Sequence, residues 1–237
     1  KNCSSLTSIT IPSGIASIAK GAFNNCTGLS SITIPDSVTS IGNYAFKNCS
    51  SLSSITIPDN VTSIGISAFR SCTSLTSITI PDGVTSIGDY VFANCTGLSS
   101  ITIPDSVTSI GSYAFYGCTG LAGVTFEGDA PTFGANVFQN SDSATIYYYG
   151  DATGFASPTF QGRPSQISSI TFTLNNAGTE YAVSDCDVTA SGSLDIPSTY
   201  RGLPVTSIAG GTFEGGGAFY NCTGLSSITI PDSVTSI

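Results

Sequence analysis

The sequence predicts a right-handed solenoid that is mostly β, with one parallel sheet of short strands and at most single-turn helices in each coil. The first reason is a period: among the 237 residues, cysteines recur every 23 residues, at positions 3, 26, 49, 72, 95 and 118. The second reason is that the residues between them repeat, in the form CTGLSSITIPDSVTSIGxxAFxN. The third is physical: one unit cannot bury its own apolar side chains, so successive units must stack. Crossovers between parallel strands are right-handed, which predicts the hand.

Each unit begins with a short strand, as the copy at residues 26–48 illustrates. Ile32 and Ile34 are two residues apart, so they point to one face of the strand, whereas Thr33 points to the other. The next residue, Pro35, has no N–H and is expected to end the strand pairing. A turn follows, because the residue after the proline is an aspartate, which favours turns.

The second half of the unit returns the chain to the start of the next coil. Val38 and Ile41 provide another apolar pair, and Gly42 permits a bend. We expect no more than one helical turn around residues 44–46, since only about a dozen residues remain to cross back. Stacked coils lie about 4.8 Å apart. Equivalent side chains should therefore form columns, such as Ile34, Ile57, Ile80 and Ile103, and Phe46, Phe69, Phe92 and Phe115.

The repeat weakens after residue 118, and this predicts the domain organisation. Three segments are expected: an array of 23-residue units over residues 1–140, its C-terminal cap over 141–164, and the N-terminal cap and truncated start of a second array over 165–237. The cap is rich in tyrosine, which has an apolar body and a polar tip suited to a terminal coil. The chain starts and stops inside a unit, so we expect it to be a fragment of a longer protein.

Two irregular features are expected in the third segment. Residues 170–174 alternate like a strand, and a turn sequence after them predicts a hairpin with a second strand that starts at Tyr181. Further on, five extra residues around Tyr200–Leu203 interrupt the repeat and are expected to bulge out.

Composition excludes several classes of function. Six Lys and Arg stand against fifteen Asp and Glu, for a net charge of −9, and there is no His. Without His there is no Ser–His or Cys–His catalytic pair, so no catalytic residues are predicted. An acidic chain with few cations also argues against nucleic acid as a partner. No apolar run is long enough to span a membrane in this fragment, and no signal peptide is visible.

The repeat resembles the BspA-like leucine-rich repeats of bacterial and protist surface proteins. The resemblance is close over residues 1 to about 140 and returns, with insertions, in roughly the last 35. It implies a leucine-rich-repeat solenoid that is not an enzyme, is secreted or attached to the cell surface, and serves adhesion and protein recognition. The residues that carry it in one unit are Leu29, Ile32, Ile34, Pro35, Val38, Ile41, Gly42, Ala45, Phe46 and Cys49.

The outward strand side chains are the candidate binding face. They should form two rows of hydroxyls, and the residues expected to bind are Ser31, Thr33, Ser54, Thr56, Ser77, Thr79, Ser100 and Thr102, with Ser8 and Thr10 continuing the rows. The partner would be a protein or a glycan, or neighbouring copies of the chain in an extracellular filament or sheath. Ice binding is a further alternative, and short hydroxyl residues could also merely suit a crowded, exposed sheet.

Three other columns each have two interpretations, and on the favoured ones no cofactor or metal site is predicted. The stacked cysteines are buried small apolar residues, or they form disulfides, for which the coil spacing is slightly too wide; Cys186 lies outside the column. The asparagines before the cysteines, such as Asn25, cap turns or accept glycans. A third column either occupies turns or recruits calcium, and consists of Asp36, Asp59, Asp82, Asp105 and Asp232.

Overall fold

The computed structural model describes residues 2–168, 170–175, 177–186, 191–210 and 217–237. The chain divides into two compact units. The first contains Lys1–Tyr147 and Ala152–Gln166, and the second contains Tyr148–Asp151 and Ile167–Ile237. Each unit has its own apolar core. The boundaries of the three segments expected from the sequence stay predictions.

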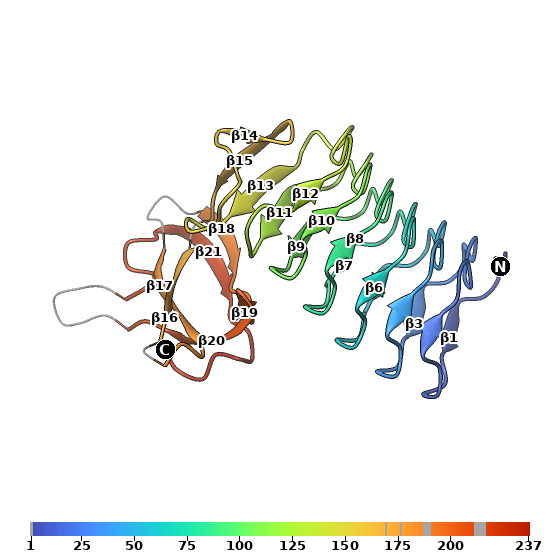
Figure 1. Ribbon diagram of the computed structural model, residues 1–237, viewed down its shortest axis with the longest axis horizontal. Helices are drawn as coiled ribbons and strands as arrows, with labels where there is room; N and C mark the ends of the chain where they lie inside the picture. The colour runs from blue at the N-terminus through green and yellow to red at the C-terminus, as the bar shows by residue number, and fades with distance from the viewer. Residues whose placement is uncertain (1, 169, 176, 187–190, 211–216) are drawn as a thin grey trace. The chain divides into compact units, whose positions relative to one another are not determined.

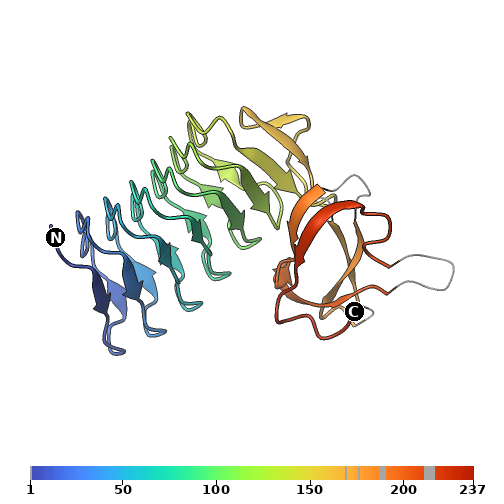
Figure 2. The same cartoon turned by 180° about the vertical axis from the view of Figure 1, so that it is seen from behind.

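The first unit is a solenoid of parallel strands, as predicted, and its coils follow one another from the N-terminus (Figures 1 and 2). The expected strand of each coil is present, and the strands form one row: β1 (Ser8–Thr10), β3 (Ser31–Thr33), β5 (Ser54–Ile55), β7 (Ser77–Ile78), β9 (Ser100–Ile103), β11 (Gly123–Phe126) and β13 (Thr145–Tyr148). Partners are parallel and one period apart, for example Ser8 with Ser31 and Ile101 with Val124. The 23-residue period is therefore the register of the sheet.

The expectation of one parallel sheet is incomplete, because a second row of strands runs along the array. The order of this six-stranded sheet is β12-β10-β8-β6-β4-β2. Each strand has only two residues, too few for an alternating pattern to be recognised in the sequence. The strands are β2 (Ser17–Ile18), β4 (Ser40–Ile41), β6 (Ser63–Ile64), β8 (Ser86–Ile87), β10 (Ser109–Ile110) and β12 (Thr132–Phe133).

The third side of each coil, which we call the turn side, consists of linked turns at residues 19–25, 42–48, 65–71, 88–94, 111–117 and 134–140. Neighbouring coils are joined here by backbone hydrogen bonds: Tyr44 N–H donates to Ile66 O (2.9 Å) and Phe46 N–H to Ala68 O (2.8 Å). The described residues contain no helix, in keeping with the expectation of one helical turn at most. Instead, each coil places two residues in the left-handed region, such as Tyr44 (φ 60°) and Asn48 (φ 61°).

The predicted columns form the core of the first unit. Phe69 is fully buried, and its ring stacks on Phe46 at 5.4 Å and on Phe92 at 5.8 Å between centroids. The same stacking joins consecutive rings through the whole array: Phe23, Phe46, Phe69, Phe92, Phe115 and Phe138. Side chains that repeat in sequence therefore pack on their own equivalents.

The cysteines of the array are buried from Cys26 onward, whereas Cys3 is exposed, and the structure has no disulfide among the described residues. From Cys49 to Cys118 they do more than fill space, because each of these four thiols donates to a phenylalanine carbonyl of an earlier coil; for Cys118 Sγ and Phe92 O the distance is 3.0 Å. The next residue in the column is Ser141, whose Oγ donates to Phe115 O at 2.6 Å. Burial raises the pKa of the Cys118 thiol to about 12, so it stays protonated and able to donate.

The end of the first unit is closed by aromatic rings. A hairpin of β14 (Thr159–Phe160) and β15 (Arg163–Ile167) continues the sheet beside β13. Phe155 lies 5.2 Å from Phe126 and Phe160 lies 5.4 Å from Phe133, between ring centroids. Phe155 and Phe160 are partly buried and pack against the core of the first unit.

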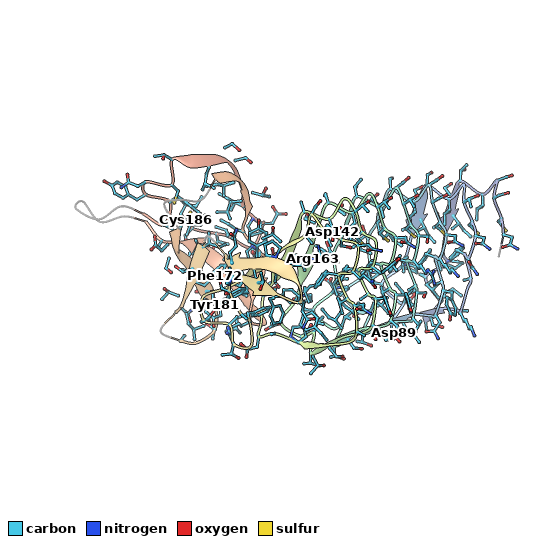
Figure 3. The ribbon with its side chains drawn as sticks, turned by 90° about the horizontal axis from the view of Figure 1, so that it is seen from above. Asp89, Asp142, Arg163, Phe172, Tyr181 and Cys186 are labelled. Carbon is cyan, nitrogen blue, oxygen red and sulfur yellow. The ribbon has the colours of Figure 1, made fainter. Side chains whose placement is uncertain are left out.

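The second unit contains the predicted hairpin, in which β16 (Ile170–Leu174) pairs antiparallel with β17 (Tyr181–Cys186). The expectation that Tyr200–Leu203 bulges out is wrong, because Tyr200 is only 2% exposed. Its ring packs on Phe172 and Tyr181, both labelled in Figure 3. The inserted residues form a tight hairpin of β19 (Thr199–Tyr200) with β20 (Leu203–Ile208). The remaining pair is β18 (Ser191–Asp195) with β21 (Gly224–Thr229).

The two short hairpins share a sequence pattern, Thr-aromatic-x-Gly-x-Pro. It occurs at residues 159–164 and again at 199–204. In both hairpins the two loop residues have positive φ, with values of 52° and 72° in the first and 49° and 72° in the second. Two left-handed residues in succession form the turn that matches the twist of paired strands. Each unit therefore uses the same local sequence to reverse the chain.

Candidate protein-binding surface

The first strand row presents the predicted hydroxyls to solvent. Along β3, Ile32 is buried, whereas Ser31 and Thr33 are exposed, and the alternation is the same in the other coils. We call this surface the hydroxyl face; all of its members are exposed, namely Ser8, Thr10, Ser31, Thr33, Ser54, Thr56, Ser77, Thr79, Ser100 and Thr102. The strand register places equivalent hydroxyls on adjacent rungs, as for Ser54 with Ser77. The two rows thus exist; their binding role stays a prediction.

The side chains of the hydroxyl face have no hydrogen-bond partner among the described protein residues. The column immediately before them behaves differently: Ser30 Oγ donates to Thr7 O (3.1 Å), Thr76 Oγ1 to Ser53 O (3.3 Å) and Ser99 Oγ to Thr76 O (3.2 Å). Those hydroxyls link coils and are used within the fold. The hydroxyl face instead keeps its donors and acceptors available, because its side chains stand away from the backbone of both neighbouring strands.

The hydroxyl face ends where the repeat degenerates. In β11 the position of the first hydroxyl is taken by Gly123. The Tyr147 ring lies over it, since a Cβ added at Gly123 would be 3.4 Å from Tyr147 Cε2. The regular rows therefore extend over five coils, from β1 to β9, and an aromatic side chain borders them at the C-terminal end.

The aspartate column lies on the turn that follows each strand of the first row. Asp36, Asp59 and Asp82 are exposed, and the described residues contain no group of three or more ligands arranged to hold a metal ion.

One carboxyl of the first unit is buried instead of exposed. Glu127 is 7% exposed and lies one period after Pro104, at a position that is also buried in earlier coils.

The pKa of Glu127 is raised from 4.5 to about 8, chiefly because burial disfavours the charged form and secondarily because Asp82 and Asp105 are negatively charged neighbours. Glu127 has an N–H, which proline lacks, and this N–H donates to Ile103 O at 3.0 Å. Its side chain takes a position that is buried in the preceding coils as well. The sequence shows the change from Pro to Glu but not the burial of the carboxyl.

The asparagine column forms an amide ladder at the end of the turn side. Asn25 Nδ2 donates to Asn2 Oδ1 at 2.9 Å, and Asn48 Nδ2 donates to Asn25 Oδ1 at 2.6 Å. Each has a left-handed backbone, with φ of 60° or 61°. Asparagine tolerates this conformation better than most residues. These residues thus lie in the turn before the buried cysteine, as one of the two interpretations expects, and their acceptance of a glycan stays a prediction.

Sequence reasoning missed one group of residues on the turn side. Lysine, arginine and tyrosine side chains pack on one another there, for example Arg70 over the ring of Tyr90 at 5.4 Å from Cζ to the centroid. The signal was present in the sequence, because Tyr44, Tyr90 and Tyr113 are separated by whole periods. This spacing alone does not predict the group, because the basic residues contact tyrosines of the following coil. The sequence of one unit does not reveal such contacts.

Within the described residues, no helix has the length and apolar character needed to cross a membrane.

No curated protein matches the chain. The chain is similar to the T. pallidum leucine-rich repeat protein, at 32% identity over 59% of this chain and 68% of that chain, with a TM-score of 0.55. It also matches a leucine-rich repeat protein from Bacteroides ovatus, at 22% identity over 100% of this chain and 76% of that chain, with a TM-score of 0.41.

A leucine-rich cell surface protein from Faecalibacterium prausnitzii is 28% identical over 96% of this chain and 60% of that chain, with a TM-score of 0.40. The sequence also matches the BspA type leucine-rich repeat region in six copies, over residues 1–102, 85–201 and 214–237. The six copies of this repeat region cover most of the chain, and the stacked 23-residue coils agree with a repeat of that family. The chain therefore belongs to the BspA-type leucine-rich-repeat family, whose repeats form protein-interaction domains.

Proposed function

We propose that the chain is a non-catalytic recognition module, extracellular or at a cell surface, that adheres to a partner protein through the hydroxyl face. The observation that supports this most strongly is the set of exposed hydroxyls without protein partners, arranged in two rows on five successive strands. The family supports protein interaction, and its resemblance to surface proteins supports the location. A glycan partner would use the same donors and acceptors.

The mechanism we propose is the addition of many weak contacts on a rigid surface. Each serine or threonine hydroxyl can donate one hydrogen bond and accept two. Because strand pairing and the stacked core hold the rows in place, little conformational entropy is lost on binding. Contacts that are individually weak then combine, since the second and later contacts form within one complex.

A paired substitution tests the hydroxyl face. Changing Thr56 and Thr79 together to glutamine enlarges two side chains in the middle of one row without adding charge. The measurement is surface plasmon resonance on immobilised extracellular-matrix proteins: collagen, laminin and fibronectin. For whichever of these the unchanged chain binds, the double variant should bind at least tenfold more weakly, a loss of about 1.4 kcal/mol. A glycan array run in parallel tests the alternative partner.

The matched control changes Thr62 and Thr85 to glutamine, because these residues are exposed and lie directly before β6 and β8 of the second strand row, away from the hydroxyl face. This variant should bind as the unchanged chain does. Equal weakening by both pairs would contradict the assignment of the face, and so would failure of the unchanged chain to bind any of the proteins or glycans at high micromolar concentration.

A further inference from the structure

A second surface of the first unit combines cations with tyrosine rings on the turn side. Lys20 Nζ lies 5.9 Å from the centroid of the Tyr44 ring, and Lys47 Nζ lies 5.7 Å from the same centroid. Arg70 lies over the ring of Tyr90 in the same way. Such contacts hold a long, flexible cation in one place beside an aromatic ring. The basic groups are therefore fixed at the surface before any ligand arrives.

The tyrosines continue this surface toward the end of the array. Tyr90 and Tyr113 stack with 5.0 Å between centroids and 6° between planes, and Tyr116 meets Tyr113 edge to face at 5.9 Å. Two amides extend the row into the next coil, because Asn136 Nδ2 donates to the Tyr113 hydroxyl (2.9 Å) and Asn140 Nδ2 to the Tyr116 hydroxyl (3.0 Å). We call the whole set the cation–tyrosine ladder: Lys20, Tyr44, Lys47, Arg70, Tyr90, Tyr113, Tyr116, Asn136 and Asn140.

The backbone of the ladder indicates that the rings do not serve the turn itself. Tyr44, Tyr90 and Tyr113 have φ values of 60°, 57° and 58°, a left-handed conformation that is costly for a bulky residue. The equivalent position is Gly in one coil and Asn in another, at residues 21 and 136, and both types adopt this conformation more readily. Because the turn would form more easily without the tyrosines, their presence points to a role of the rings at the surface.

The distribution of charge indicates the sign of the ligand. The chain has a net charge of −9, yet its only basic residues between positions 2 and 162 are Lys20, Lys47 and Arg70, all on the turn side. The single acidic residue in the turn-side segments is Asp89, labelled in Figure 3. Its Oδ1 accepts the backbone N–H of Ser112 at 2.7 Å. The acidic residues of the repeats lie mainly at the turn after each strand, so the ladder is a local positive strip on an acidic molecule.

A polar pocket adjoins the C-terminal end of the ladder. It has a volume of about 270 Å³, and its lining includes Asn136, Gln139, Gln161 and Arg163. Arg163 Nη1 pairs with Asp142 at 2.7 Å, and both residues are labelled in Figure 3. Arg163 Nε is buried and has no hydrogen-bond partner among the described residues. The side-chain amides of Asn136, Gln139 and Gln161 give the pocket donors and acceptors that suit an oxygen-rich ligand.

We propose that the cation–tyrosine ladder binds an acidic polysaccharide, a polymer of uronic acid units, along the turn side of the array. The carboxylates of such a polymer pair with Lys47 and Arg70, its ring hydroxyls bond to the tyrosine hydroxyls and amides, and its apolar C–H faces lie on aromatic edges. Successive coils repeat at about the strand spacing, roughly 4.8 Å, which is similar to the length of one sugar residue. Three cations are too few to neutralise the dense phosphates of a nucleic acid.

This proposal uses a different surface and a different ligand from the recognition of proteins by the hydroxyl face. The test is isothermal titration calorimetry of the full chain with de-esterified polygalacturonate, in 20 mM and 200 mM NaCl. We expect binding at the lower salt and at least fivefold weaker binding at the higher salt, because screening weakens exposed charge pairs. Neutral dextran should not bind. Poly-L-glutamate, matched in carboxylate concentration, should bind at least fivefold more weakly, since it lacks the sugar rings and hydroxyls.

Two variants locate the site. The double change Lys47→Gln with Arg70→Gln should weaken binding of polygalacturonate at least tenfold. Tyr90→Asn should weaken it several-fold without lowering stability, because asparagine occupies the equivalent backbone position at residue 136. The control pair Thr56→Gln with Thr79→Gln lies on the hydroxyl face and should leave binding unchanged.

Three results would overturn the proposal. One is the absence of polygalacturonate binding in 20 mM NaCl. Another is binding of poly-L-glutamate as tight as that of the polysaccharide, because charge alone would then explain the binding. The third is unchanged binding in the Lys47 and Arg70 double variant. None of these results bears on protein binding at the hydroxyl face, so the two proposals fail separately.

Discussion

Replacing Phe69 with alanine should lower the free energy of unfolding by about 3–5 kcal/mol, the range for removal of a fully buried aromatic ring. Phe69 is 0% exposed and stacks on a phenylalanine on either side, Phe46 and Phe92. Removing its ring creates a cavity in the middle of a column whose neighbours are held by backbone pairing and cannot close the gap. The measurement is urea denaturation followed by circular dichroism.

The control for Phe69 is Phe23→Ala, at the start of the same column. Phe23 is only partly buried and stacks on one phenylalanine, Phe46. Its removal should therefore cost clearly less, about 1–2 kcal/mol. A loss below about 1 kcal/mol for Phe69→Ala, or equal losses for both variants, would show that stacking in the column contributes little to stability.

Replacing Glu127 with glutamine should remove a pH dependence of stability and stabilise the protein at alkaline pH. The pKa of the Glu127 carboxyl is about 8 in the folded chain, above its ordinary value of 4.5. Between these values the folded state holds a proton that the unfolded state has released, so this group makes stability fall as pH rises from about 4.5 to 8. The stabilisation from the substitution at pH 9 should be on the order of 5 kcal/mol.

The measurement is the urea midpoint of both proteins at several values between pH 3 and 9. The curve of the unchanged chain should fall relative to that of Glu127→Gln across this range and run parallel to it below pH 4. Asp105→Asn provides a control, because loss of a neighbouring charge should move the fall to lower pH. Parallel curves over the whole range would contradict the burial of a protonated Glu127.

The columns of the first unit could be predicted because the period is constant over six cysteines and each apolar position recurs. The second sheet could not be, since strands such as Ser40–Ile41 are too short to show an alternating pattern. The hairpin at Thr199–Tyr200 was missed for a different reason. Its pattern occurs only twice in the chain, so the inserted residues resembled an exposed loop, whereas the Tyr200 ring fills the core of the second unit.

The hydroxyl face was predictable from strand alternation, because Ser and Thr stand on either side of a buried isoleucine in each coil. The cation–tyrosine ladder was not, since it depends on contacts between coils: Lys20 belongs to one coil and Tyr44 to the next. The state of Glu127 likewise depends on Asp82, which lies almost two periods earlier in the chain. A repeat shows which residues share a column, but contacts between different columns require coordinates.

The most direct test of the account is the deletion of one whole coil, residues 49–71, compared with the deletion of only residues 49–60. The first removes 23 residues and joins Asn48 to Cys72, so Phe46 should then stack on Phe92 and every column should continue. We predict that this protein still unfolds cooperatively on heating, at a lower midpoint, because fewer coils contribute to the core. The shorter deletion should abolish the cooperative transition of the first unit, since its columns lose their register, whereas the second unit has its own core and is the same in both proteins. A cooperative transition of the first unit in both proteins, or in neither, would contradict the claim that equivalent side chains stack at intervals of one coil.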